Sequence, residues 1–426
     1  MKVLLLGSGG RESALAAALA RSRSVSELLA APGNPGIARV AELIALEITD
    51  PAAVAAQARR VGADLVVVGP EAPLVAGVAD ALRNHGVGVF GPDAGAARIE
   101  GSKSYAKELM ERAGVPTARF GSFEDVDGAV AFMDELGPPY VIKADGLAAG
   151  KGVVVTSDRT AAIGAVEDRL VRGRFGDAGR KVVVEEFLDG PEASVIAFCD
   201  GKSVLACEPA QDYKRVDDDD RGPNTGGMGS YSPVPACPVE LTARITTHVL
   251  EPMVAATAEA GAPFVGALYA GLALSERGPR VIEFNARFGD PETQALIPRL
   301  RSDLGELCLA ASCGELAGMT LSFSQEACVT VVAASGGYPG EHETGLEITG
   351  IEEAEATGAE VFHAGTALEE GLLVTAGGRV LAVSASGESF AAARRLAYDA
   401  MSKIHFTNMH VRSDVALRAE LAERGA

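Results

Sequence analysis

The chain has 426 residues, 47% hydrophobic and 23% charged, a composition typical of globular proteins rather than of disordered or fibrous ones. Its formal net charge of −20 argues against binding to nucleic acid or a membrane surface through a basic face. The six cysteines are sparse and form no CxxC pair, so we expect no disulfide and no structural zinc. No apolar run reaches the roughly 18 residues of a membrane span, and the start MKVLLLGSGGRES reads as a buried strand. A cytoplasmic enzyme fits best.

The first hundred residues alternate between short apolar runs and helix-like segments. The runs at 3–6, 64–68 and 87–90 end in the loops GSGGRE, GPEAPL and GPDAGAA. Strand, glycine-rich turn and helix in repetition predict an open parallel α/β sheet. Ligands gather at the carboxyl ends of such strands, although each loop alone could be only a tight turn.

A helix is predicted to begin at Ser102, a capping residue, and to end at Gly114 before Pro116. The acidic run 217–220 is expected to be a solvated or mobile loop. The remaining elements are, in chain order, alternating strands and helices over about 119–190, two strands within 192–212, a long helix at about 239–260, strands at about 264–274 and 280–285, and strands followed by a helix near 388–402. This pattern predicts an α/β and α+β multidomain chain divided at 1–101, 102–324 and 325–426.

The loop GSGGRE follows a predicted strand and opens a helix, which is the setting of a dinucleotide-binding fingerprint. Glu12 stands where the template has its third glycine, so the match is incomplete. An anion or phosphate on the amides of Gly9 and Gly10 is a second interpretation, and a plain turn is the third.

The segment VIKADGLAAGKGVVV, residues 141–155, places Lys143 at the end of an apolar strand. Gly146, Gly150 and Gly152 then surround Lys151 before a second strand begins. A glycine loop with lysines between two strands can close over a polyphosphate, whose charge the amides and ammonium groups neutralise. The alternative is an exposed turn with solvated lysines.

The segment VVVEEFLDGPEAS, residues 182–194, ends an apolar strand in two glutamates and carries Glu192 after a turn. Backbone groups at a strand end can pair with adenine, and a later carboxylate can accept from both ribose hydroxyls. Acidic residues at a strand end are often only solvated, so this segment alone is a weak indication.

In VIEFNARFGDPETQ, residues 281–294, Glu283 and Asn285 lie two apart on a predicted strand and so face the same side. A carboxylate and an amide oxygen are hard ligands suited to magnesium. Arg287 continues this face, where it can hold a transferring phosphoryl group. A purely structural strand is the alternative.

Together the four segments resemble the ATP-grasp ligases, which phosphorylate a carboxylate and let an amine displace the phosphate. The further segments APGNPG, VGPEAPL, GSK, QDYKR, GPNTGGMGSYSP and NARFGDPETQ resemble the family of phosphoribosylamine–glycine ligases over essentially the whole chain. The resemblance implies an ATP-grasp fold with an N-terminal α/β domain, a lid at about 119–190 and a small C-terminal α+β domain. It also implies that ATP, glycine and 5-phosphoribosylamine are the substrates and that Mg²⁺ or Mn²⁺ is the cofactor. The enzyme would be a monomer and would act in purine synthesis.

The resemblance further implies roles for individual residues. The ATP-binding residues would be Lys103, Lys143, Gly146, Gly150, Lys151 and Gly152, with Glu186 and Leu188 at the adenine and Glu192 at the ribose. The metal ligands would be Glu283 and Asn285. The phosphoribosylamine would be bound by Gly9, Gly10, Arg11, Glu71, Asp212, Lys214 and Asn224. The glycine and acyl-phosphate region would hold Arg287, Asp290 and Glu292, with Arg287, Lys143 and Asp290 as catalytic residues.

Two features depart from the family pattern. Ser13 stands where histidine is common in the N-terminal loop, and the strand LYAGLAL before Glu283 lacks the further acidic ligand of many ATP-grasp enzymes. Three other functions stay open on the sequence alone. They are a nicotinamide-dependent oxidoreductase, a non-catalytic nucleotide-binding regulator and a biotin-dependent carboxylase.

Overall fold

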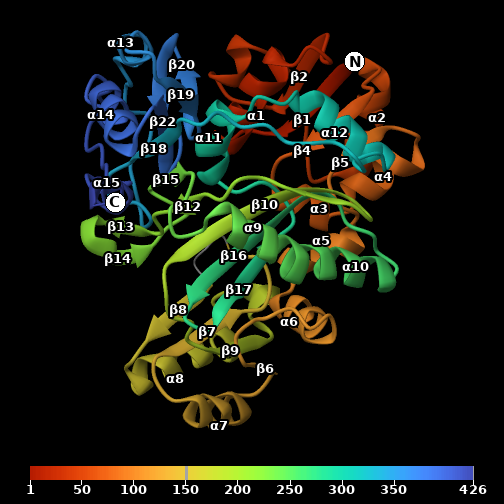
Figure 1. The fold of residues 1–426 in the computed structure, drawn as a ribbon, viewed down its shortest axis with the longest axis vertical. Helices are drawn as coiled ribbons and strands as arrows, with labels where there is room; N and C mark the ends of the chain where they lie inside the picture. The colour runs from red at the N-terminus through yellow and green to blue at the C-terminus, as the bar shows by residue number, and fades with distance from the viewer. Residues whose placement is uncertain (149–151, 426) are drawn as a thin grey trace.

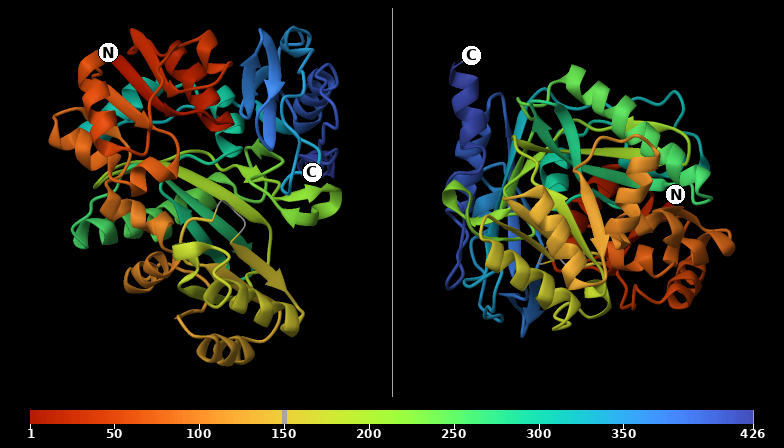
Figure 2. Two further views of the ribbon diagram at one scale, coloured as in Figure 1. Left: turned by 180° about the vertical axis from the view of Figure 1, so that it is seen from behind. Right: turned by 90° about the horizontal axis from the view of Figure 1, so that it is seen from below.

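The computed structural model describes residues 1–148 and 152–425. The N-terminal and C-terminal parts lie next to each other at one end of the molecule (Figure 1). A second group of strands and helices lies at the opposite end, and a central antiparallel sheet lies between the two ends. Figure 2 shows the same arrangement from behind and from below.

The N-terminal sheet is open and parallel, in the strand order β3-β2-β1-β4-β5, which confirms the predicted architecture. Its strands are β1 (Lys2–Gly7), β2 (Glu27–Pro32), β3 (Glu42–Leu43), β4 (Leu65–Val68) and β5 (Gly88–Phe90). Its helices are α1 (Gly10–Arg21), α2 (Pro51–Val61), α3 (Glu71–Val75), α4 (Val78–Asn84) and α5 (Ala94–Gly101). The inner strands β1 and β4 are buried along nearly their whole length, as their continuous apolar runs predict for a sheet covered on both faces.

The helix α6 (Lys103–Arg112) begins where its capping residue predicts, because the Ser102 hydroxyl accepts from the backbone of Tyr105. It leads into an antiparallel sheet in the order β6-β9-β7-β8, which we call the lid sheet after the lid predicted at about 119–190. The elements of this part are β6 (Phe120–Phe123), α7 (Val126–Leu136), β7 (Tyr140–Ala144), β8 (Val153–Thr156), α8 (Arg159–Leu170) and β9 (Val182–Glu186). Buried residues of these elements form a separate small core, so the lid sheet packs as a unit of its own.

The central sheet has the order β11-β10-β16-β17 and is antiparallel. Its strands are β10 (Glu192–Asp200), β11 (Val204–Ala206), β16 (Val265–Ser275) and β17 (Gly278–Asn285). The predicted long helix is present as α9 (Val239–Ile245) and α10 (Glu251–Glu259), joined by a π-helical turn over Thr246–Leu250. Pro252 has no backbone N–H to donate one turn back, which is a physical reason for the altered turn.

The C-terminal sheet has the order β12-β15-β18-β22-β19. Its strands are β12 (Gln211–Asp212), β15 (Gly229–Ser232), β18 (Ala327–Ala334), β19 (Glu360–His363) and β22 (Arg379–Gly387). The hairpin β20 (Thr366–Glu369) and β21 (Leu372–Thr375), with the helices α11 (Glu292–Leu296), α12 (Leu304–Cys313), α13 (Ile351–Glu355), α14 (Phe390–Met401) and α15 (Leu417–Gly425), completes the chain. Two strands from before residue 325 thus extend this sheet, while the domain boundaries themselves stay predictions.

The exposure of the acidic run at 217–220 agrees with the prediction of a solvated loop, and the structure adds contacts that the sequence did not predict. The run lies in the turn between β13 (Arg215–Asp217) and β14 (Arg221–Asn224), and its side chains are largely exposed. The C-terminal segment nevertheless holds it, because Asp218 accepts from the Ser413 amide at 2.8 Å and Asp220 accepts from Arg412 at 3.2 Å. Charge pairing between segments far apart in sequence therefore anchors the run.

All six cysteines carry free thiols, and five of them are buried, which confirms the expectation of no disulfide. Burial raises the pKa of the Cys207 and Cys328 thiols to about 12. Within residues 1–148 and 152–425, no helix has the length and apolar character needed to cross a membrane.

Candidate active site

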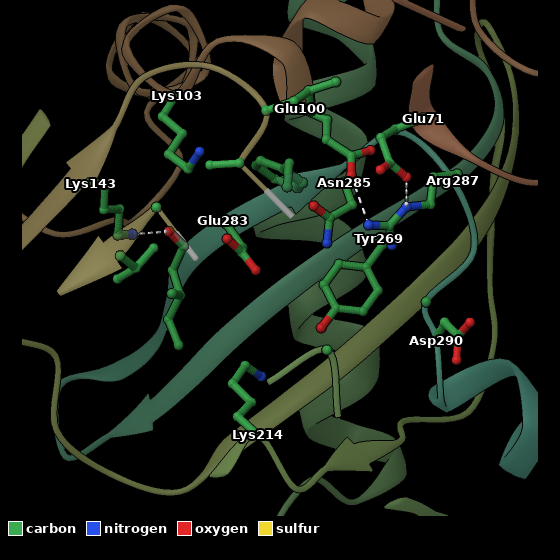
Figure 3. Close-up of a pocket in the computed structure, with 18 of the residues that line it drawn as sticks. Glu71, Glu100, Lys103, Lys143, Lys214, Tyr269, Glu283, Asn285, Arg287 and Asp290 are labelled. Atoms are coloured by element: carbon green, nitrogen blue, oxygen red, sulfur yellow. Dashed lines mark hydrogen bonds and ion pairs between the residues drawn. The ribbon is translucent and has the colours of Figure 1, made fainter. Parts of the chain in front are cut away.

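A cavity of about 500 Å³ lies where the N-terminal part, the lid sheet, the central sheet and the C-terminal part meet (Figure 3). It brings together most of the residues predicted from the sequence. The predicted residues that line it are Arg11, Glu71, Lys103, Lys143, Gly152, Asp212, Lys214, Glu283, Asn285, Arg287, Asp290 and Glu292. In Figure 3 the two lysines 103 and 143 lie on one side of Glu283, and Arg287 lies on the other.

Other predicted residues lie away from the cavity lining. They are Gly9, Gly10, Gly146, Glu186, Leu188, Glu192 and Asn224, whereas Gly150 and Lys151 lie outside the described residues. Glu192 is close all the same, because its Oε2 is 2.9 Å from the Lys214 ammonium group. Asn224 adjoins Thr225, which lines the cavity. The Glu186 carboxylate pairs with Arg280 at 3.0 Å.

On the lysine side of the cavity, Lys143 contacts two buried residues that the sequence analysis did not single out, Glu185 directly and Lys107 through Glu185. Lys143 Nζ lies 3.0 Å from Glu185 Oε2 and 3.0 Å from the carbonyl of Ile282, and Lys107 Nζ lies 3.0 Å from the same Glu185 oxygen. Burial lowers the pKa of Lys107 to about 8. Burial also opposes charge on Glu185, but the two ammonium groups outweigh it and lower the pKa of this carboxyl. Since Lys107 is four residues from Lys103 on α6, helical spacing offered a signal.

Glu283 and Asn285 both reach the cavity from β17, as their spacing predicts. The surrounding donors and acceptors orient the Asn285 amide nitrogen toward Glu100 Oε1, 3.2 Å away, which leaves the amide oxygen free for a cation. Gly271 lies opposite Glu283 in the sheet register, so β16 supplies no second carboxylate there. Among the described residues, no group of three or more His, Cys, Asp or Glu could hold a metal ion. A divalent cation here fits only with phosphate or water oxygens as further ligands.

Arg287 lies between two carboxylates of the N-terminal part. Its Nε is 3.1 Å from Glu71 Oε2, and its Nη2 is 2.8 Å from Glu100 Oε1 (Figure 3). Burial opposes the charge on Arg287, but the two carboxylates outweigh it and raise its pKa. The other Glu100 oxygen accepts from the Ala286 amide at 2.7 Å, and burial raises the pKa of Glu100. Glu100 was missed because it lies inside a helix with no motif around it.

A polar cluster occupies the side of the cavity beside Lys214. The Lys214 ammonium lies 2.6 Å from Asp212 Oδ1, and burial raises the pKa of Asp212 to about 6. Tyr269 on β16 donates to Glu292 Oε1 at 2.9 Å, and Ser194 on β10 donates to the same oxygen at 3.0 Å. Ser194 ends the segment VVVEEFLDGPEAS, in which the sequence analysis considered only the carboxylates, and Tyr269 lies within an apolar strand outside the site motifs.

In the N-terminal loop, the structure does not favour the interpretation that an anion binds the Gly9 amide. That amide donates to Glu12 Oε2 at 2.7 Å, so the helix caps itself and the Gly9 N–H is not free. A side chain at Gly69 would place its Cβ 2.1 Å from Glu12 Oε1, so Glu12 fills the space beside the loop. Arg11 points to the cavity, with its Nη1 donating to the carbonyl of Phe288 at 3.1 Å.

Ser13, the departure from the family pattern, does not line the cavity. It is buried, and its hydroxyl donates to the carbonyl of His363 on β19 at 2.5 Å. The Asn34 amide donates to the same carbonyl at 2.9 Å. Ser13 therefore joins the N-terminal part to the C-terminal part.

The C-terminal part contributes two further residues to the cavity, Arg379 and Tyr338. Arg379 Nη1 lies 2.8 Å from the carbonyl oxygen of Asp290 and 3.3 Å from its carboxylate, and the Tyr338 hydroxyl accepts from the Gly226 amide at 2.9 Å. Burial opposes charge on Asp290, but Arg379 and Arg11 outweigh it and lower the pKa of this carboxyl. The sequence analysis missed both residues, since they follow the other site motifs by more than forty positions.

Three family models match the chain in order. They are the phosphoribosylglycinamide synthetase N domain over residues 1–100, the ATP-grasp (A) domain over 101–293 and the C domain over 328–418. The chain belongs to the phosphoribosylglycinamide synthetase family. It is 51% identical to the phosphoribosylamine–glycine ligase of Mesorhizobium japonicum, with 100% of each chain covered.

Solved structures agree with this family. The phosphoribosylamine–glycine ligase of Thermotoga maritima is 34% identical, with a TM-score of 0.83 over 98% of this chain and 100% of that one. The biotin carboxylase domain of the Hydrogenobacter thermophilus 2-oxoglutarate carboxylase has a TM-score of 0.73 over 96% of this chain and 91% of that one. At 17% identity, that second likeness shows the fold alone. The predicted ATP-grasp architecture and family are confirmed, and the chain is an ATP-dependent ligase.

Proposed function

We propose that the chain joins glycine to 5-phospho-D-ribosylamine while ATP is converted to ADP and phosphate, the second step of purine synthesis. The product is N1-(5-phospho-D-ribosyl)glycinamide. The observation that carries this proposal is one cavity holding a lysine pair, the oxygens of Glu283 and Asn285, and Arg287. These are the groups that a phosphoryl transfer from ATP to a carboxylate requires.

In the first step, a carboxylate oxygen of glycine attacks the γ-phosphorus of ATP, and the bond to the bridging oxygen of ADP breaks. Glycyl phosphate and ADP result. Two of the three Lys143 N–H donors are taken by Glu185 and Ile282, which directs the third to the ligand. Arg287 stabilises the charge that develops on the phosphoryl group. Glu283 and Asn285 would hold Mg²⁺ or Mn²⁺, which when bound supplies positive charge beside the phosphates.

In the second step, the amine of phosphoribosylamine attacks the acyl carbon of glycyl phosphate. Phosphate leaves with the former carboxylate oxygen, and one amine proton passes to solvent. An amine is already a good nucleophile, so this step needs no strong general base. We place the phosphoribosylamine near Arg11, Glu71 and the segments that carry Lys214 and Asn224. Asp290, held by Arg379, borders the same region and contacts the backbone of Arg11.

Glycyl phosphate would hydrolyse if water reached it, so the cavity must exclude water during the reaction. We assign this task to the glycine loop between β7 and β8, of which Gly146 and Gly152 are described. Gly146 lies against the lysine side, because its carbonyl accepts from Lys103 Nζ at 3.0 Å.

We further propose a cytoplasmic monomer that binds small molecules and no nucleic acid. The six free cysteines suit a reducing compartment, and the net charge of −20 opposes binding to a polyanion. A molar mass near the chain mass of 43.7 kDa in light scattering would support the monomer, and twice that mass would contradict it.

The experiment that tests the proposal uses glycine labelled with ¹⁸O in both carboxylate oxygens. The proposed chemistry transfers one labelled oxygen to inorganic phosphate and leaves the other in the product amide. Mass spectrometry of both products should therefore find one label in each. Unlabelled phosphate from a turning-over enzyme would rule out glycyl phosphate, and the absence of glycinamide ribonucleotide would rule out the ligation.

A further inference from the structure

Lys107 is a buried lysine of α6 that the reaction steps described above do not use. It lies on the buried face of this helix, whose other members are small or apolar, and it lines the cavity although only 2% of it is exposed. Its ammonium group donates to Thr117 Oγ1 at 2.7 Å and pairs with Glu185 Oε2 at 3.0 Å. Burying an ammonium group is costly, and an apolar side chain at such a position is often at least as stable. A lysine here therefore indicates a role in the site beyond packing.

Lys107 is connected to the site through the carboxylate of Glu185. The same Glu185 Oε2 also lies 3.0 Å from Lys143 Nζ, while Glu185 Oε1 has no hydrogen-bond partner among the described residues. Two ammonium groups thus share one carboxylate oxygen, and the three charged groups together keep one positive charge. Without Lys107, Glu185 and Lys143 would form a neutral pair.

The positive charge of this group matters because ATP carries a triphosphate. In a buried site the dielectric constant is lower than in water, so one unit of charge near a phosphate has a strong effect on binding. Thr117 keeps Lys107 in place, since its hydroxyl also donates to the carbonyl of Val281 at 2.7 Å. Lys143 contacts the next carbonyl of β17, that of Ile282, so both lysines are fixed to the same strand.

We infer that Lys107 is a positioning residue that offsets the charge of Glu185. Glu185 can then fix the ammonium group of Lys143 without cancelling its positive charge toward the ATP phosphates. Lys107 acts through Glu185 and not by contact with ATP. This inference rests on the role of Lys143 in the proposed function and explains why a second, buried lysine stands behind it.

The test measures the Kd of ATP and of adenosine by calorimetry, without glycine, so that no ligation occurs. In Lys107→Met the Kd of ATP should rise about tenfold or more, and the Kd of adenosine, which has no phosphate, should change less than about threefold. The double variant Lys107→Met with Glu185→Gln removes one positive and one negative charge. Its Kd of ATP should therefore return to within about threefold of the wild-type value, whereas a purely structural role predicts that the two losses add.

The double variant also keeps the test decisive if Lys107→Met alone does not fold. The single substitution leaves a buried carboxylate with one partner fewer, but the double variant replaces that carboxylate by a neutral amide. Lys202→Met, at an exposed position between β10 and β11, is the matched control and should bind ATP as wild type does. Thermal unfolding of each variant without ligand shows that the protein is folded.

Wild-type affinity for ATP in Lys107→Met would overturn the inference. A folded double variant that binds ATP about tenfold more weakly than wild type would also overturn it, because Lys107 would then act on ATP directly or only on the fold. Wild-type affinity for ATP in Lys143→Met would remove the proposed role of Lys143 and this inference with it. An enzyme that shows the predicted ATP affinities but makes no glycinamide ribonucleotide would instead overturn the proposed ligation and support the role of Lys107.

Discussion

At the scale of single residues, Arg287 lies in a setting that keeps it charged and fixed. Glu71 and Glu100 bind its guanidinium group, and its remaining donors face the cavity or the carbonyl of Phe288. A preorganised cation of this kind stabilises charge in the transition state without rearranging. The role of Arg287 therefore depends on geometry as well as on charge.

Replacing Arg287 by alanine should lower kcat about a hundredfold or more, because the donor to the phosphoryl group is lost. Arg287→Lys keeps a charge but loses the two-sided pairing, and should recover only part of the activity. Steady-state ADP release measures both variants. Arg301→Ala, at an exposed position, is the control with expected wild-type activity. Full turnover by Arg287→Ala would remove the proposed role.

Glu100 supports three consecutive residues at the end of β17. It pairs with Arg287, accepts from the Ala286 amide and accepts from the Asn285 amide nitrogen. In Glu100→Ala the buried Ala286 N–H loses its acceptor, so the free energy of unfolding should fall by about 1–3 kcal/mol. Glu100→Gln keeps an acceptor and should lose less stability, while kcat falls about tenfold because Arg287 loses a charged partner.

Urea unfolding and kcat together separate these two effects. A Glu100→Gln protein with wild-type stability and wild-type kcat would show that the carboxylate charge does not position Arg287. An equal fall in stability for both variants would show that its contribution is only structural.

The raised pKa of Asp212 predicts a pH dependence of turnover. Burial and its carboxylate neighbours shift this pKa upward to about 6, so Asp212 gains a proton as the pH falls through that value. Protonation removes a negative charge from the group formed with Glu192, Glu292, Lys214 and Tyr269. The ion pair that fixes Lys214 is then weakened, so kcat/KM should fall as the pH drops from 7 to 5, with an inflection near 6. In Asp212→Asn this inflection should disappear, and its persistence would assign the titration to another group.

The raised pKa of Asp212 also affects how the free energy of unfolding depends on pH. Because the pKa of Asp212 is higher in the native chain than in the unfolded one, ionising this carboxyl opposes folding. This unfavourable contribution is absent below the ordinary aspartate pKa of about 3.9 and complete above about 6.

Several site residues were predictable because their spacing carries the chemistry. Glu283 and Asn285 two apart on a strand, and the lysine at the end of β7, are examples that the cavity brings together. Glu100 and Tyr269 were not predictable, since the first lies in an ordinary helix and the second in an apolar strand. Their importance follows from tertiary contacts that no local pattern records.

At the scale of elements, Arg412 in the C-terminal part holds the segment around Lys214 in place. Arg412 is fully buried, lies 4.7 Å from the ring centre of Tyr213 and donates to the carbonyl of Arg215 at 2.9 Å. It also pairs with Asp220 and Asp414. One arginine thus holds the chain on both sides of Lys214.

Removing this arginine in Arg412→Met should lower the free energy of unfolding by about 3 kcal/mol, because its buried hydrogen bonds and ion pairs are lost. Chemical denaturation measures the change. Arg418→Ala is the matched control, since this exposed guanidinium also pairs with Asp220 but should contribute less than about 1 kcal/mol. Equal effects of the two variants would contradict the assignment of Arg412 as the anchor.

The elements themselves followed the local rules where those rules are strong. The cap at Ser102, the glycine after α6 and the buried apolar runs of the parallel sheet placed α6, β1 and β4 where expected. The pairing of β15 with β18 was not predictable, because it joins segments about a hundred residues apart. Such pairings depend on the packed whole rather than on the sequence of either strand.

At the scale of the whole molecule, the site exists only where four parts of the chain meet. The N-terminal part supplies Arg11, Glu71 and Glu100, the lid sheet supplies Lys143, the central sheet supplies Glu283, and the C-terminal part supplies Arg379. The chain as a whole is strongly acidic, but seven of the lysines and arginines that the structure describes line this cavity. The basic groups needed for anionic substrates are thus concentrated at one place.

The measurement that tests the central claim most directly is ADP release by the purified protein with MgATP, glycine and phosphoribosylamine formed in place from ribose 5-phosphate and ammonia. We predict ADP release that requires all three substrates, with glycinamide ribonucleotide formed in equal amount. ATP binding without ADP release would indicate a nucleotide-binding regulator instead. ADP release that persists when glycine or phosphoribosylamine is omitted would contradict the ligation proposed here.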